Sequence, residues 1–487
     1  MESTDTPRPV TRELCEWISS LSLSDIPTEK VTRVKYLILD GLACALIAAR
    51  LPWSEAAVKG VLTMESSGRC GIIGWDKKTG PLAAALLNST FIQGFELDDY
   101  HSGAPIHSSS IVLPTLLAAV EHCDVSTDEQ PLVGGAEFLL AAIVGYETGP
   151  RVGLGVYGIE VLTHGWHSGA IFGPAASAAT AAKLFQLPAS TIEDAIGIAC
   201  TQAGGLMSAQ YESTAKRMQH GFATRNGLFA AFMARNGYTG IKQVLERPYG
   251  GFLSNFSLGN GRTPAYVPGE VVNGLGERWE IDRIVVKPYA SVATTHSTID
   301  ALMALQTRYP TQMAAVHQIR RIRVEMSEVS FKKCGWTPRR PLTPTGAQMS
   351  ATYAAAMQLL EGEVQAAQFA PAQLERDDLW SLMDRIHCEQ NMELESFQQR
   401  VHVELDGQAA PLTEFVTAPR GNGVPLSNQD ILDKWRRLTA DVIDSERQAA
   451  IERIVLQLET VQDVRQLARL LSGRTGNIFE AGYKTKL

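Results

Sequence analysis

Apolar residues recur at three- and four-residue spacing along most of the first 270 residues, the period of an amphipathic helix. The first long stretch, 27–49, opens with Pro27, which suits the first turn of a helix. Short segments marked by Gly or Pro separate the stretches. The pattern predicts helices at 27–49, 80–97, 112–123, 135–147, 169–185, 190–209 and 220–235.

The pattern changes near residue 276, where RWEIDRIVVKPYA and IRRIRVEMSEVSF alternate β-branched and polar residues as strands do. Helices are predicted at about 345–361 and 376–390, followed by a hairpin that turns at Asp406-Gly407. Two amphipathic helices, 429–442 and 445–471, close the chain. We therefore expect a mostly α fold with a smaller α+β domain: a helical part at 1–275, the α+β domain at 276–414, and 415–487 returning to the helical part.

Composition adds limits on partners and location. The 487 residues are 45% hydrophobic and 20% charged, as in an ordinary globular protein. A net charge of -8 gives no basic face for nucleic acid or an anionic membrane, so an anionic ligand would need a local cationic pocket. Without a secretory signal or a long apolar span, we expect an intracellular, cytoplasmic protein with no membrane partner, a mitochondrial location staying open.

Cysteine and glycine spacing bear on cofactors. The seven cysteines are scattered and none has CxxC spacing, so the sequence offers no iron-sulfur ligand cluster and side chains must do the chemistry. The glycines of Gly153-Leu-Gly155-Val-Tyr-Gly158 follow a predicted helix, whereas a dinucleotide-binding fingerprint follows a strand. We predict neither a metal nor an organic cofactor.

The densest polar cluster connects two apolar helices at residues 96–110. It brings carboxylates, imidazoles and hydroxyls together on one short segment, which favours an active site. Two other interpretations stay open: a capped, solvated loop, or a metal site. The candidate residues are Asp98, Asp99, Tyr100, His101 and His107.

Three later segments contain imidazole or phenol groups close in sequence to a cationic side chain or to the start of a helix. Both a cation and a helix N-terminus attract anions. His167 could instead cap its helix, and Lys216 could be solvated. The candidates are His167 before a helix near Gly169; Lys216, Arg217 and His220 in an apolar helix; and Lys287, Tyr289 and His296 after a strand.

On these segments the chain resembles the MmgE/PrpD family, which includes 2-methylcitrate dehydratase and cis-aconitate decarboxylase. The resemblance runs nearly end to end and is strongest in KYLILDGLACA, FIQGFELDDYHSGAPIHSSSIVLP, THGWHSG, ACTQAGGLMSAQY and KRMQHGFATRNG. Among family members, the chain looks most like the fungal cis-aconitate decarboxylases. The resemblance implies a large helical domain built from both chain ends, a smaller α+β lid, a homodimer, and an active site between the two domains.

The resemblance also implies roles for the candidate residues. Catalytic roles fall on Asp98, His107, His167, Lys216 and Lys287. The neighbouring candidates are expected to bind substrate: Asp99, Tyr100, His101, Arg217, His220, Tyr289 and His296. The implied reaction is the decarboxylation of cis-aconitate, or of an alkyl analogue, to an itaconate-type product.

Two alternatives stay open at this point. Differences from decarboxylase relatives at Gly103, 212–214 and 291–295 alter the expected pocket shape and leave an alkylcitrate or 2-methylcitrate dehydratase of a fungal biosynthetic pathway possible. A non-catalytic helical scaffold is the other alternative. For either lyase we expect His107, oriented by Asp98 or Asp99, to move the proton, and cationic side chains to hold the carboxylates.

Overall fold

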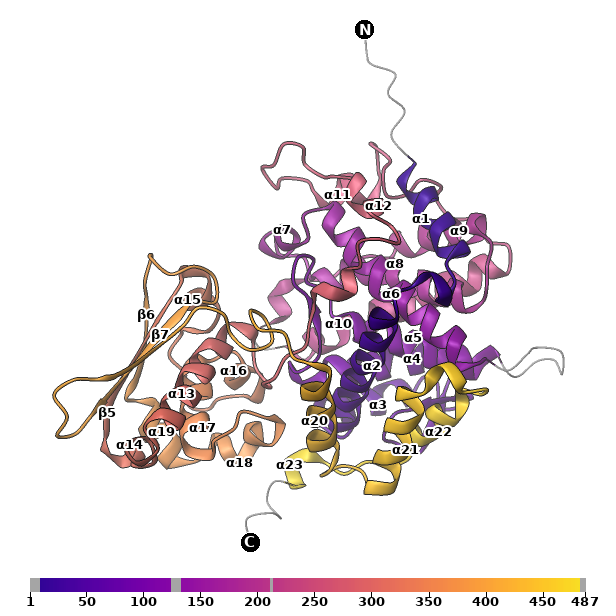
Figure 1. Cartoon of the computed structure of the whole chain (residues 1–487). Helices are drawn as coiled ribbons and strands as arrows, with labels where there is room; N and C mark the ends of the chain where they lie inside the picture. Colours follow the sequence, from indigo (N-terminus) through magenta and orange to yellow (C-terminus); the bar gives the residue numbers. More distant parts are fainter. Residues whose placement is uncertain (1–8, 124–132, 211–212, 482–487) are drawn as a thin grey trace.

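The computed structural model describes residues 9–123, 133–210 and 213–481. Its helical body is built around α8, whose small side chains let α6 and α10 pack closely against it. Figure 1 shows these helices grouped in one body. The body helices are α1 Val10–Ser20, α2 Thr28–Ala48, α3 Pro52–Leu62, α4 Pro81–Ile92, α5 Ser108–Cys123, α6 Gly135–Gly155, α7 Gly158–Thr163, α8 Ser168–Leu184, α9 Ala189–Cys200, α10 Ala215–Arg235, α11 Phe252–Phe256 and α12 Gly269–Val272.

A second region contains a four-stranded sheet in the order β6-β5-β7-β8. β5 pairs with β6 in parallel and with β7 in antiparallel, while β7 and β8 form the predicted hairpin. Buried residues alternate with partly exposed ones along β7, so the sheet buries one face, against which α13 packs. The elements are α13 His296–Arg308, α14 Pro310–Ala314, β5 Ile319–Met326, α15 Glu328–Cys334, α16 Pro344–Gln348, α17 Ala351–Glu361, α18 Pro371–Leu374, α19 Asp377–Met383, β6 Ile386–Gln390, β7 Gln399–Leu405 and β8 Leu412–Val416.

After the sheet the chain returns to the helical body. α20 and α21 pack against α2, as Figure 1 shows, and α22 packs against β1, so helices from both ends of the chain share one core. The returning helices are α20 Asn428–Thr439, α21 Ser445–Leu456, α22 Arg465–Ser472 and α23 Ile478–Ala481. The expected fold class, mostly α with a smaller α+β domain, is confirmed.

Short elements complete the connections. There are two small antiparallel pairs: β1 and β2 form a local hairpin, while β3 with β4 ties the polar cluster to the segment before Lys287. The strands are β1 Cys70–Ile72, β2 Lys77–Thr79, β3 Tyr100–His101 and β4 Ile284–Val285. The 3-10 helices are η1 Leu23–Asp25, η2 Gln93–Phe95, η3 Met207–Gln210, η4 Glu280–Arg283, η5 Ala293–Thr295, η6 Val316–Gln318, η7 Ala366–Phe369 and η8 Leu458–Thr460.

Several predicted element boundaries are wrong. The helix predicted at 376–390 ends at Met383, and β6 follows because pairing with β5 overrides the local helical pattern. The predicted helix 445–471 is divided by η8, and the predicted helix 190–209 ends at Cys200. The strand predicted after residue 277 is only β4, because η4 precedes it.

Within the described ranges, no helix combines the length and the apolar character needed to cross a membrane. The glycines of the GxGxxG match lie in and after α6, with no strand before them, as the sequence predicted. Residue 212, the first of the segment 212–214 in which the sequence differs from decarboxylase relatives, lies outside the described residues.

Candidate active site

The polar cluster is held rigidly between α4 and α5. Glu96 has a positive φ of 56°, a left-handed conformation that turns the chain out of η2. Asp98 and Asp99 are fully buried. The Asp99 carboxylate accepts hydrogen bonds from the Ser109 backbone N–H at 3.0 Å and from its hydroxyl at 2.9 Å, which ties the segment to the first turn of α5. A solvated loop is therefore excluded.

His107 is oriented by Asp98. The Nδ1 atom of His107 lies 3.0 Å from Oδ2 of Asp98, and 18% of the His107 side chain is exposed. A carboxylate at Nδ1 fixes the orientation of the ring and leaves Nε2 to meet a ligand. The second carboxylate oxygen of Asp98 is buried and has no protein partner among the described residues.

Three imidazole rings from different elements lie in a row. The ring centroids of His107 and His220 are 5.0 Å apart, and those of His220 and His167 are 4.8 Å apart. His167 stands at the N-cap of α8, but its side chain makes no capping hydrogen bond, so capping does not explain its position. Both ring nitrogens of His220 and Nδ1 of His167 are buried without a protein partner in the described part of the chain. They are available to a bound molecule.

Burial sets the charge of these rings. It lowers the pKa of His167 to about 3, with the nearby His107 as a second cause. It also lowers the pKa of His220 well below its usual value, an effect that His167 and His107 increase. Both rings are therefore neutral at neutral pH. Of the three histidines in the row, only His107 has a carboxylate partner.

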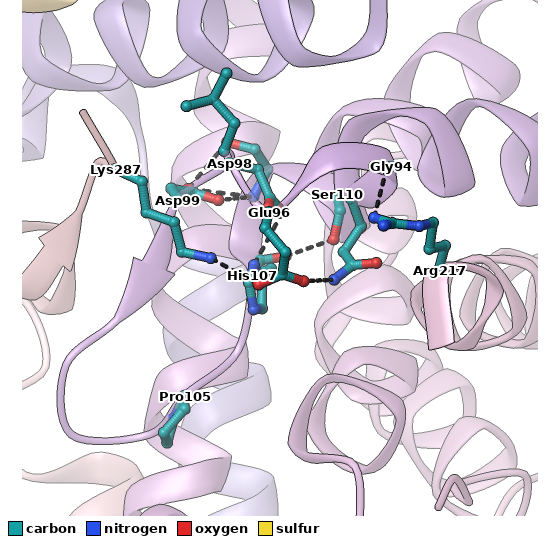
Figure 2. A network of polar contacts seen from close by, with 12 residues as sticks. Gly94, Glu96, Asp98, Asp99, Pro105, His107, Ser110, Arg217 and Lys287 are labelled. Carbon is teal, nitrogen blue, oxygen red and sulfur yellow. Dashed lines mark hydrogen bonds and ion pairs between the residues drawn. The ribbon is translucent and has the colours of Figure 1, made fainter. Parts of the chain in front are cut away.

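Two buried lysines meet at Glu96. Figure 2 shows Lys287 pointing toward the Glu96 carboxylate, with its Nζ 3.1 Å from Oε2. The Lys216 ammonium contacts the other oxygen of Glu96. Burial lowers the pKa of Lys216, with Arg217 adding to it, and lowers the pKa of Lys287 to about 8. The solvated-lysine interpretation of Lys216 is wrong, since the residue is only 6% exposed.

Glu96 itself was missed as a site residue. It lies in the acidic stretch that the sequence singles out, but nothing in the sequence indicates that its side chain would turn toward the lysines. The left-handed backbone at Glu96 is set by the packing around it. The protein thus places its own carboxylate where two cations could hold a substrate carboxylate.

Tyr100 and Arg217 also contact the cluster. The Tyr100 ring centroid lies 6.4 Å from that of His107, and its hydroxyl donates to Asn422 at 2.8 Å. Arg217 is buried and donates to the Gly94 carbonyl (Figure 2) and to Gln348 at 2.8 Å. The guanidinium therefore joins the turn before Glu96 to α16 of the sheet region.

Three predicted site residues are turned toward other protein groups. His101 places Nε2 3.0 Å from Glu280, and its Nδ1 accepts from the Ala104 N–H. The Tyr289 hydroxyl donates to Asp300 at 2.5 Å. His296 packs edge-on against Tyr289, and burial, followed by the charge of Lys287, lowers its pKa to about 3. Within the described part of the chain, none of the three makes a hydrogen bond or ring contact with His107 or Lys216.

The alternative of a metal site at the cluster receives no support from this geometry. The four candidate ligands are bonded to protein groups instead: Asp98 and His107 to each other, Asp99 to Ser109, and His101 to Glu280. In residues 9–123, 133–210 and 213–481, no three His, Cys, Asp or Glu side chains gather at metal-ligand spacing. The arrangement instead combines a carboxylate-supported imidazole, two neutral imidazoles and two ammonium groups, which suits proton transfer to a bound polycarboxylate.

Comparison with known proteins covers both regions of the fold. Residues 12–264 match the MmgE/PrpD N-terminal domain and residues 289–460 match the MmgE/PrpD C-terminal domain. A cis-aconitate decarboxylase-like protein of Aspergillus oryzae is 49% identical over 472 residues, which cover 95% of this chain and 97% of that protein. A cis-aconitate decarboxylase of Aspergillus terreus is 45% identical over 473 residues, covering 95% and 96%. The human cis-aconitate decarboxylase is 26% identical over 475 residues, covering 95% of each chain.

Proposed function

This chain belongs to the MmgE/PrpD family, and from that premise we propose that it is a carbon–carbon lyase that removes carbon dioxide from cis-aconitate. Over nearly the full length, a relative that is 45% identical carries the name of this activity, and one that is 49% identical is named as cis-aconitate decarboxylase-like. The observation that carries the proposal is the hydrogen bond between His107 and Asp98 beside two buried lysines. This arrangement places an imidazole that can donate a proton beside two ammonium groups that can bind an anion.

The reaction needs one bond broken and one proton delivered. The bond between the departing carboxylate and the methylene carbon of cis-aconitate breaks, and its electron pair forms a new double bond to that methylene. The electron pair of the old double bond moves to the double-bond carbon that carries a hydrogen atom and a retained carboxylate. A proton adds to this carbon, so the products are itaconate and carbon dioxide. The protein must therefore supply an acid at one carbon and positive charge at the retained carboxylates.

His107 is the proposed acid. Its Nδ1 faces the Asp98 carboxylate, which orients the ring, and 18% of the side chain stays exposed. His167 and His220 are neutral because burial lowers their pKa values, so they do not compete for this role at neutral pH. A positioned general acid contributes about 10²- to 10⁴-fold in rate.

Lys216 and Lys287 are proposed to hold the retained carboxylates, which carry part of the charge in the transition state. Their contacts with Glu96 support this role, because they already bind a carboxylate in the free chain. His167 and His220 offer ring nitrogens without adding positive charge. We place the departing carboxylate beside these two neutral rings. A cation there would stabilise the negative charge of this carboxylate and so oppose its loss as neutral carbon dioxide.

The test is the product balance with three substrates. The purified chain is incubated with cis-aconitate, citrate and 2-methylcitrate, while released carbon dioxide and product mass are measured. We expect one carbon dioxide per itaconate from cis-aconitate. Loss of water alone from the citrates would identify a dehydratase instead. Absence of any turnover would favour a non-catalytic scaffold, an alternative that the burial of the clustered side chains argues against.

Assembly, location and domain limits also remain proposals. We propose a homodimer in the cytoplasm, acting on a small polycarboxylate without a cofactor, with domain limits at 275/276 and 414/415. Light scattering would test the assembly, because the 52.9 kDa chain should give about twice that mass as a dimer.

A further inference from the structure

A buried lysine from the end of the chain reaches the polar cluster. Lys434 of α20 is 3% exposed, and its Nζ donates a hydrogen bond to the Leu97 carbonyl at 2.7 Å. The same ammonium lies 2.6 Å from Oδ1 of Asp40 in α2, a carboxylate that is fully buried. Three elements that are far apart in sequence therefore meet behind the active-site segment.

The contact falls at the centre of the proposed site. Leu97 stands between Glu96, which bridges the two lysines, and Asp98, which orients His107. A hydrogen bond to the Leu97 carbonyl fixes the peptide plane that joins Leu97 to Asp98. Rotation of that plane changes ψ of Leu97 and φ of Asp98, so it would turn the Asp98 carboxylate away from His107 and disturb the backbone that carries Glu96, the residue before Leu97.

A second contact comes from the same returning segment. The Asn422 side chain accepts the Tyr100 hydroxyl hydrogen bond, so residues 422 and 434 hold two points of the segment 96–101. The Lys434 charge also reaches Lys287, whose pKa it lowers in addition to the larger effect of burial. The returning segment thus contacts the polar cluster at 96–101 and also affects the charge of Lys287.

Stability alone does not account for the pair of Lys434 and Asp40. A buried ion pair loses hydration on both charges, and apolar residues of similar size often serve a core equally well. Burial raises the pKa of Asp40, and Lys434 opposes that change. Keeping two charges in this core therefore calls for a role that an apolar pair could not fill.

We propose that Lys434, with Asp40 as its counter-ion, is a positioning residue for the decarboxylation. It holds the Leu97 carbonyl so that Asp98 orients His107 while Glu96 faces Lys216 and Lys287. Lys434 does not touch the substrate. This inference rests on the proposed function for its kinetic effect, but its geometric effect is independent of the substrate.

The kinetic test uses Lys434→Met, the double variant Asp40→Asn/Lys434→Met, and Arg437→Met as a matched control on the exposed side of α20. Lys434→Met should lower kcat about 10- to 100-fold, the cost of a small misplacement of catalytic groups. The double variant removes both charges, so its denaturation midpoint should return toward the unaltered value while kcat stays low. Arg437→Met should leave both unchanged.

Two results would overturn the inference. One is an unchanged kcat in Lys434→Met; the other is a double variant that recovers kcat together with stability, since that pattern belongs to a purely structural pair. Crystal structures of the unaltered chain and of Lys434→Met add a readout without substrate. The Leu97 carbonyl should rotate and the His107 to Asp98 hydrogen bond should lengthen. Unchanged geometry overturns the inference even if the unaltered chain releases no carbon dioxide, a result that would separately refute the proposed function.

Discussion

Glu96 shows how much a single side chain can change the account of this site. The sequence assigns Lys216 and Lys287 to substrate carboxylates, and both are buried as such a role requires. In the free chain, however, both contact Glu96. A substrate carboxylate must therefore either displace Glu96 or bind beside it, and the charge of Glu96 opposes a trianionic substrate.

Replacing Glu96 with Gln should make the free chain less stable. The substitution keeps the size of the side chain but leaves two buried ammonium groups without their carboxylate, a loss of about 3 to 5 kcal/mol for a buried pair. Cis-aconitate should then raise the denaturation temperature more in Glu96→Gln than in the unaltered chain, because its carboxylate replaces the missing charge. Thermal unfolding with and without cis-aconitate measures both effects.

Glu16→Gln is the matched control. Glu16 pairs with Arg12 on the exposed surface of α1, where an ion pair contributes little, so neither shift should occur. Equal stabilisation by cis-aconitate in Glu96→Gln and the unaltered chain would contradict the idea that Glu96 occupies the position of a substrate carboxylate.

The pKa of Lys287 sets a limit on activity at high pH. Burial lowers this pKa to about 8, so Lys287 is charged below that pH and neutral above it. If the charged form holds a substrate carboxylate, kcat/KM should fall as the pH rises through about 8. A profile of kcat/KM against pH measures this limb, which should be absent from the residual activity of Lys287→Met. A level profile across this range would remove Lys287 from the binding role.

At the scale of elements, periodicity predicted helices well and their ends poorly. α2, α8 and α10 lie where the apolar pattern indicates them. β6 could not be predicted in the same way, because Ile386–Gln390 becomes a strand only through its pairing with β5. The predicted helix 80–97 likewise ends early, as α4 at Ile92, and η2 then leads to the left-handed turn at Glu96, which tertiary packing fixes.

The packing of α8 against α10 depends on Gly169. A Cβ atom at this position would lie 1.9 Å from Nε2 of His220. The ring has little room to move aside, since the ring centroids of His107 and His167 lie 5.0 and 4.8 Å from its own. Gly169→Ala should therefore displace His220 and lower kcat by about tenfold or more.

Gly60→Ala provides the control for that substitution. Gly60 also lies in a helix, α3, but a Cβ there would meet nothing within 4 Å. This change should leave kcat unaltered and slightly stabilise the chain, as Ala favours helices over Gly. Steady-state kinetics measures kcat of both variants, and thermal unfolding measures their stability. Full activity in Gly169→Ala would show that the position of His220 is not important.

At the scale of the whole molecule, the chain brings together residues from four distant segments. The family resemblance allowed the sequence to name His107, His167, Lys216 and Lys287, and the structure places the first two beside His220 and the last two at Glu96. The sequence could not show that His101 pairs with Glu280, or that Lys434 reaches Leu97 across 337 positions. Such contacts depend on how the chain ends return to one body.

The most direct test of the account separates binding from turnover at His107. Cis-aconitate binding is measured by calorimetry and carbon dioxide release by rate assay, in the unaltered chain, in His107→Gln and in the exposed control His164→Gln. We predict that His107→Gln binds cis-aconitate almost as well as the unaltered chain but loses about 10²- to 10⁴-fold in rate, while His164→Gln keeps both. Normal carbon dioxide release by His107→Gln would contradict the account.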